Sequence, residues 1–249
     1  QINPNGGLHF QGITPLWAAS QEGHIRIVKA LLNHPAINPN QATNDDEVTP
    51  LYVAVERGHL NVVKELLKHH ATDPNQGMNG GQTPLLLATE LRNLIIVKEL
   101  LKHTSINPNQ AKMRDGVNPL IFAADSGYLE LVNELLKHPD INPNQQNTDT
   151  GMTPLYRASW EGHIEIVNKL LEYGADPNLE RTDGWGDPLF IASEKGQLDV
   201  VRILSINQAD PNNIPDKHGV TPLFIAVIKG HLNIVKELLA NGANPNIAK

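Results

Sequence analysis

The sequence predicts an all-α solenoid of about seven stacked helix–turn–helix units with projecting loops, and three observations lead to this prediction. The tripeptide Thr-Pro-Leu or a near copy recurs every 34 or 35 residues. Each copy precedes two short apolar segments that a Gly-His pair or a variant of it separates. Each unit then closes on Pro-Asn. The tripeptides begin at Thr14, Thr49, Thr83, Asn118, Thr153, Asp187 and Thr221, and the closing residues are Asn40, Asn75, Asn109, Asn144, Asn178, Asn212 and Asn246.

The first element of each unit is a short helix that begins at the proline. Thr14 is a good N-cap because its hydroxyl can accept a hydrogen bond from a free backbone amide. Pro15 then fills the first helical position, where its missing N–H costs nothing. Asn118 and Asp187 keep the capping chemistry in their units. A Gly-His pair such as Gly23-His24 ends this helix.

The second element is an amphipathic helix, and a loop follows it. Ile27, Val28, Leu31 and Leu32 form the one-sided apolar stripe of such a helix. Glycines (Gly174, Gly242) or a turn such as His34-Pro35 mark its end. The polar stretch from Gln110 to Val117 contains the turn pair Asp115-Gly116, so we expect projecting loops between units.

A single unit of this kind cannot bury its own apolar faces, so the core must come from stacking. No linker or change of composition interrupts the repeats, and we therefore expect one elongated domain over residues 1–249, with units starting near residues 9, 44, 78, 113, 148, 182 and 216. Ile2 to Asn5 matches the end of a further unit. One interpretation is therefore that the chain is a fragment of a longer protein.

These elements closely resemble the ankyrin-repeat family over essentially the whole chain. The fifth unit contains Thr153-Pro154-Leu155, Gly162-His163, Leu170-Leu171 and Gly174-Ala175-Asp176-Pro177-Asn178. The family usually has histidine two places after the proline, whereas this chain has Trp17, Tyr52, Leu86, Ile121, Tyr156, Phe190 and Phe224 there. The third unit replaces Gly-His by Arg92-Asn93, and the sixth has Ser205 and Gln208 in place of a core leucine and the helix-ending glycine. We expect these two units to form the weaker junctions.

Composition and motifs argue against most chemistries. The net charge of −7 disfavours nucleic-acid and anionic-membrane partners, and the absence of cysteine excludes disulfides, Cys-ligated zinc and thiol nucleophiles. No common hydrolase, phosphate-loop or dinucleotide motif occurs, so we expect no catalytic residue, no cofactor and no metal site. Eight of the eleven histidines fall in two periodic positions: His24, His59, His163 and His231 after the turn glycine, and His34, His69, His103 and His138 at the end of the second helix. For the second set we expect a cation interacting with the helix-end carbonyls.

The resemblance implies that a partner binds the concave side, formed by loop tips and by the two residues before each turn glycine. Those two positions hold six acidic and three basic residues over the seven units, which predicts a protein partner with a basic patch. Trp160 stands in this row, Met152 lies in the preceding loop and Trp185 in the following loop. We therefore propose as partner-binding residues Trp160, Glu161, Trp185, Met152, Leu91, Arg57, Glu56 and Ile228. The alternative is that Trp160 packs on the neighbouring helix and Trp185 only holds its own loop.

The function predicted from these residues is a protein–protein interaction module that acts as a monomer and binds a folded partner or a peptide. Two alternatives remain open: a targeting domain of a larger enzyme or bacterial effector, and an engineered binding scaffold. An enzyme within the repeats is the least favoured reading. The expected location is the cytoplasm, or a host cell if the protein is a bacterial effector.

Overall fold

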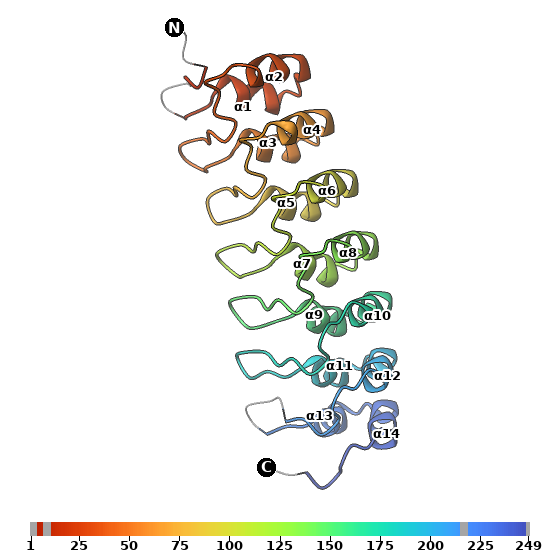
Figure 1. Cartoon of the computed structure of the whole chain (residues 1–249). Coiled ribbons are helices and arrows are strands. Elements are labelled where there is room, and N and C mark those ends of the chain that lie inside the picture. Colours follow the sequence, from red (N-terminus) through yellow and green to blue (C-terminus); the bar gives the residue numbers. More distant parts are fainter. Residues whose placement is uncertain (1–3, 7–10, 215–218, 248–249) are drawn as a thin grey trace. The chain divides into compact units, whose positions relative to one another are not determined.

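The computed structural model describes residues 4–6, 11–214 and 219–247, and its contacts divide the chain into two compact units, Gln1–Pro119 and Leu120–Lys249. Within the described residues there are fourteen α-helices and no β-strand (Figure 1). The helices are α1 Pro15–Gln21, α2 Ile25–Leu32, α3 Pro50–Glu56, α4 Leu60–Lys68, α5 Pro84–Glu90, α6 Leu94–Leu101, α7 Pro119–Asp125, α8 Leu129–Leu136, α9 Pro154–Glu161, α10 Ile164–Glu172, α11 Pro188–Lys195, α12 Leu198–Ile206, α13 Pro222–Lys229 and α14 Leu232–Ala240. The prediction of about seven helix pairs is confirmed.

The first helix of each pair starts as the capping pattern predicts. The Thr14 hydroxyl accepts a hydrogen bond from the Trp17 amide at 3.1 Å, and Pro15 occupies the first turn of α1. In α11 the Asp187 carboxylate replaces the threonine hydroxyl and accepts from the Phe190 amide at 2.7 Å. Each cap satisfies one of the backbone amides that a helix start leaves without a partner.

The core of each unit lies between neighbouring helix pairs. The apolar stripes of the second helices are buried: Val63, Leu66 and Leu100 are completely covered in the first unit, and Val167 and Leu170 in the second. In five repeats the side chain in the slot where the family usually has histidine is buried as well, for example Tyr52 and Tyr156 at 4% and 1% exposure, whereas Trp17 is half-buried and Phe224 is 53% exposed. In those five repeats the large apolar group in this slot therefore packs in the core.

A different histidine supplies a hydrogen bond between repeats. The Nε2–H of His59, after the turn glycine of the second repeat, donates to the Gln21 carbonyl of the first repeat at 2.9 Å. His163 and His231 reach the Asp125 and Glu194 carbonyls in the same way, at 3.2 and 3.1 Å. The His59 ring also lies against the turn glycine of the preceding repeat, since a Cβ atom on Gly23 would lie 2.8 Å from that ring.

The histidines at the ends of the second helices act differently from our expectation. The Nδ1 atom of His34 accepts a hydrogen bond from the Ala36 amide at 3.2 Å, and that of His138 accepts from the Asp140 amide at 3.2 Å. An acceptor nitrogen must be unprotonated, so these imidazoles cap a turn as neutral acceptors. The expectation of a cation interacting with the helix-end carbonyls was wrong.

The asparagines that close the repeats form hydrogen bonds to the repeat that follows. Asn178 donates from Nδ2 to the Gln208 carbonyl at 3.0 Å and accepts at Oδ1 from the Asp210 amide at 2.8 Å. Among the described residues the same pair of bonds, 2.6 to 3.0 Å long, is made by Asn5, Asn40, Asn75, Asn144, Asn178 and Asn212. We call this series the asparagine ladder. It gives the repeated Pro-Asn a physical role between repeats.

The projecting loops are also linked within the first unit. Figure 1 shows these loops extending on the same side of the helix pairs. The Asn44 amide donates to the Gln11 carbonyl at 3.0 Å, and the Asn79 amide to the Asp46 carbonyl at 2.8 Å. Successive loops are thus joined by backbone hydrogen bonds as well as by the helices below them.

Candidate functional site

Trp160 lies at the end of α9 on the same helical face as Tyr156, four residues earlier. The two ring centroids are 6.2 Å apart and the rings are tilted by 51°. Tyr156 is buried in the core, whereas Trp160 is half-buried. The inner edge of the indole therefore rests on the core, and the remainder faces outward.

Two cations lie on the Trp160 ring. The Arg157 guanidinium carbon is 5.7 Å from the ring centroid, and the Lys195 Nζ atom of α11 is 3.9 Å from it. Contacts of this kind are favourable because the face of an indole carries negative electrostatic potential. Trp160 thus connects α9 with the following repeat through Lys195.

Arg157 links three more residues to this cluster. It forms a close ion pair with Asp125 of the preceding repeat and a longer one with Glu161, at 4.0 Å. Its Nη1 atom lies 3.9 Å from the Met152 Sδ atom. The structure therefore brings together three predicted site residues, Trp160, Glu161 and Met152, through Arg157, which is not among the predicted site residues.

Trp185 is tied to α9 through the loop that contains it. Arg181 donates to the Tyr156 hydroxyl oxygen at 3.2 Å and forms a close ion pair with Asp183. The Trp185 amide donates to the Asp183 carboxylate at 3.2 Å, and the Tyr156 hydroxyl lies 3.5 Å from the Trp185 carbonyl oxygen. Trp185 is 47% exposed. Hydrogen bonds to Tyr156 and Asp183 thus hold the loop in place, while the Trp185 side chain faces solvent.

The environment of Tyr156 keeps its hydroxyl protonated. Burial raises the pKa of Tyr156, and the hydrogen bond from Arg181 opposes that rise. A phenol that stays neutral can donate to the Trp185 carbonyl while accepting from Arg181. Tyr156 is buried and contacts Trp160, Arg181 and the Trp185 carbonyl, and the sequence did not single it out as a site residue. Its aromatic side chain in the slot that is usually histidine was the available signal.

The other predicted site residues lie outside this cluster of contacts. Glu56 and Arg57, at the end of α3, are 3.6 Å apart as an exposed ion pair. Leu91, after α5, is 49% exposed, and Ile228, near the end of α13, is 62% exposed. Each is accessible to a partner, and the described contacts do not connect them with Trp160.

Ion pairs reduce the acidic surplus of the predicted row. In addition to the pairs with Arg157, Glu90 lies 3.2 Å from Lys112 and Glu194 lies 3.2 Å from Lys229. With the Glu56–Arg57 pair, five of the six acids of this row have a cation within 4.0 Å. A simple count of charges in the sequence therefore overstates the negative charge available to a partner.

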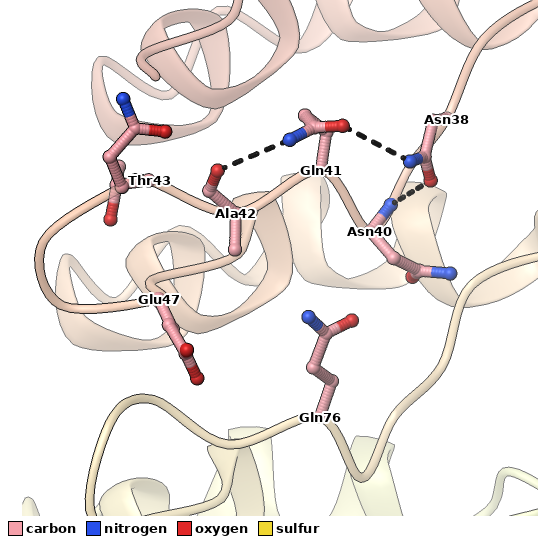
Figure 2. A pocket seen from close by; sticks show the side chains of 8 residues that line it. Asn38, Asn40, Gln41, Ala42, Thr43, Glu47 and Gln76 are labelled. Atoms are coloured by element: carbon pink, nitrogen blue, oxygen red, sulfur yellow. Dashed lines mark hydrogen bonds between the residues drawn. The ribbon is translucent and has the colours of Figure 1, made fainter. Parts of the chain in front are cut away.

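A polar hollow of about 430 Å³ lies at the base of the loops in the first unit (Figure 2). Its lining is rich in amides, and Glu47 is the charged group in it. The lining residues are Asn38, Asn40, Gln41, Ala42, Thr43, Asn44, Glu47 and Gln76. Asn38 donates to the Gln41 side chain at 3.4 Å and accepts from the Asn40 amide at 3.1 Å, so several of these amides bond to one another.

Two further features concern the described part of the chain. It contains no group of three or more His, Asp or Glu side chains placed to hold a metal ion. None of its helices has the length and apolarity that crossing a membrane requires.

The fold and these contacts define the class of protein: a stack of helix–turn–helix repeats, in which the half-buried Trp160 and the exposed Trp185 both contact the buried Tyr156. A family model described as ankyrin repeats (3 copies) matches residues 2–78, 70–147, 108–181 and 179–249. The chain belongs to the ankyrin-repeat family, whose domains generally serve as protein–protein interaction modules.

Two solved structures illustrate the similarity. The ankyrin repeat domain of Bcl-3, described as a unique member of the IkappaB protein family, is 26% identical with a TM-score of 0.80, over 91% of this chain and 98% of that one. An ankyrin repeat domain from Acinetobacter baumannii AYE is 28% identical with a TM-score of 0.72, over 78% of this chain and 98% of that one. No curated protein sequence gave a significant match.

Proposed function

We propose that this protein binds a folded partner or a peptide on the surface formed by the ends of its first helices and the adjoining loops, with Trp160 and Trp185 as the principal anchors. The observation that supports this most is the arrangement of the two indoles. Both occupy positions that the repeat does not dictate, both are fixed from below through Tyr156, and both keep an outward-facing part. Large, rigid aromatic side chains contribute most to many protein interfaces.

Met152 and Glu161 flank the anchors, Ile228 is a further proposed contact in the same unit, and Leu91, Arg57 and Glu56 are proposed contacts in the first unit. The acidic residues of this row favour a partner with a basic patch. Because most of these acids are already paired, we assign the larger share of the affinity to the apolar anchors.

Affinity capture tests this proposal. The wild type and the Trp160→Ala/Trp185→Ala double variant are used as baits in parallel, after circular dichroism has shown equal helix content, and captured proteins are quantified by mass spectrometry. We expect a small set of proteins to be retained by the wild type and lost with the double variant. Equal capture by both baits would place binding elsewhere on the molecule.

A further inference from the structure

We propose that Lys195 and Trp160 together select a partner segment in which an acidic side chain lies next to an apolar one. This inference rests on the proposed function and adds the chemistry of the partner at that site. It arises from one difference between Lys195 and the other cations of the cluster.

The other cations around the two tryptophans are engaged by carboxylates. Arg157 pairs with Asp125 and Glu161, and Arg181 pairs with Asp183. In the part of the chain that the structure describes, Lys195 takes part in no such ion pair, and its ammonium group lies 3.9 Å from the centre of the Trp160 ring. The cation that covers the anchor is thus exposed and has no carboxylate partner there.

This placement determines what a partner can add. A partner carboxylate on the Lys195 ammonium group would sit beside the indole, because the ammonium group itself lies over the ring. A neighbouring apolar side chain of the partner would then reach the outward part of Trp160, whose inner side is occupied by Tyr156 and Arg157. An ammonium group retained in an apolar contact without a carboxylate would have to be desolvated at a cost, so an acidic residue makes the contact favourable.

A basic partner segment is the competing possibility. Glu161 is exposed and only loosely paired with Arg157, at 4.0 Å, so it could attract a cation. That cation would approach an anchor already covered by Lys195 and flanked by Arg157, and like charges there disfavour it. The positions of the cations therefore favour the acidic segment at this site.

A random dodecapeptide library, selected against the full chain, tests the inference. We expect the enriched peptides to contain Asp or Glu within two positions of an aromatic residue, Leu or Ile. Synthetic copies should bind Lys195→Glu at least about tenfold more weakly than the wild type, a loss in the range measured for charge pairs at interfaces. A library selected against Lys195→Glu should be enriched in Lys or Arg at the same place.

Lys236→Glu is the matched control, since it makes the same change of charge on the exposed side of α14. It should change the affinity by less than about twofold, because exposed charges beyond a screening length interact weakly. Basic or uncharged consensus peptides, or equal losses in Lys195→Glu and Lys236→Glu, would overturn the inference.

A Trp160→Ala arm separates this inference from the proposed function. If the selected peptides lose affinity in Trp160→Ala but tolerate Lys195→Glu, the proposed site stands and the acidic partner is wrong. If they bind Trp160→Ala as tightly as the wild type, or if no peptide is enriched, the proposed site itself is contradicted. Thermal unfolding of each variant ensures that the compared proteins are folded.

Discussion

At the residue scale, Arg92 and Gln208 have left-handed backbone conformations, with φ of 56° and 68°, at positions where other repeats have glycine. This conformation costs a residue with a side chain about 1–2 kcal/mol, whereas glycine adopts it freely. We predict that Gln208→Gly raises the free energy of unfolding by about 0.5–1 kcal/mol, since the greater freedom of glycine in the unfolded chain offsets part of the gain. Denaturant titration measures the change. Gln208→Ala is the control and should give no gain; a stabilised alanine variant would contradict the explanation.

Asp187 is a second residue whose surroundings lead to a prediction. It is completely buried, and burial raises its pKa to about 6, against the opposing effect of hydrogen bonds from Phe190 and Asn213. A carboxyl group whose pKa is higher in the folded protein binds protons more readily there. Wild-type folding is therefore favoured as the pH falls through 6, and this contribution is lost at higher pH.

Replacing Asp187 by threonine, the cap residue of five other repeats, should remove this pH dependence. We predict that the difference in unfolding free energy, Asp187→Thr minus wild type, increases by about 2–3 kcal/mol from pH 4 to pH 8. Urea titrations at several pH values test this. A difference that stays constant, or that decreases with pH, would show that the carboxyl group does not titrate as described.

At the element scale, the asparagine ladder links neighbouring repeats through the turn that follows the second helix of each pair. Asn178→Ala removes two hydrogen bonds to the next repeat, which together contribute about 1–2 kcal/mol because exposed bonds of this kind give modest net stabilisation. We expect the Asp210 amide to exchange with solvent faster in this variant. Asn168→Ala, on the exposed face of α10, is the matched control. Equal destabilisation by both variants would mean that the ladder contributes nothing specific.

The elements themselves were predictable from the sequence, and their partners were not. The Thr-Pro pairs and apolar stripes predict the helix starts and buried faces because those depend on local hydrogen bonds and on periodicity. The asparagine ladder joins residues 30 or more positions apart, so no local pattern reveals it. The roles of His59 and His34 depend on which backbone atoms lie near each ring nitrogen, which only the folded chain determines.

At the scale of the whole molecule, stability should vary along the chain. Repeats contribute stability in series, so a weak junction can open without the others. We predict faster amide hydrogen exchange around Arg92 and over residues 205–208 than in the fifth repeat, where Gly162 and Gly174 occupy the left-handed positions. Exchange measured by mass spectrometry on the intact chain tests this. Uniform protection across the repeats would contradict it.

The candidate site was predictable only in part. Trp160, Met152 and Trp185 stand out in the sequence because the repeat does not require large apolar residues there. The sequence could not reveal that Arg157, Arg181 and Tyr156 join them, because these side-chain contacts depend on how the loops and neighbouring helices pack. It also overstated the acidic surface, since ion pairing depends on which side chains meet.

Whether Trp160 anchors a partner or only supports the fold is the central question, and one measurement addresses it directly. Binding affinity for a partner captured by the wild type and the melting temperature are measured on the same preparations of wild type, Trp160→Ala and Trp17→Ala. Trp17→Ala is the control, a half-buried tryptophan of α1 in the packing slot. We predict that Trp160→Ala weakens binding by about 2 kcal/mol or more with little change in melting temperature, whereas Trp17→Ala lowers the melting temperature and spares binding. Intact affinity in Trp160→Ala together with a clearly lowered melting temperature would contradict the account.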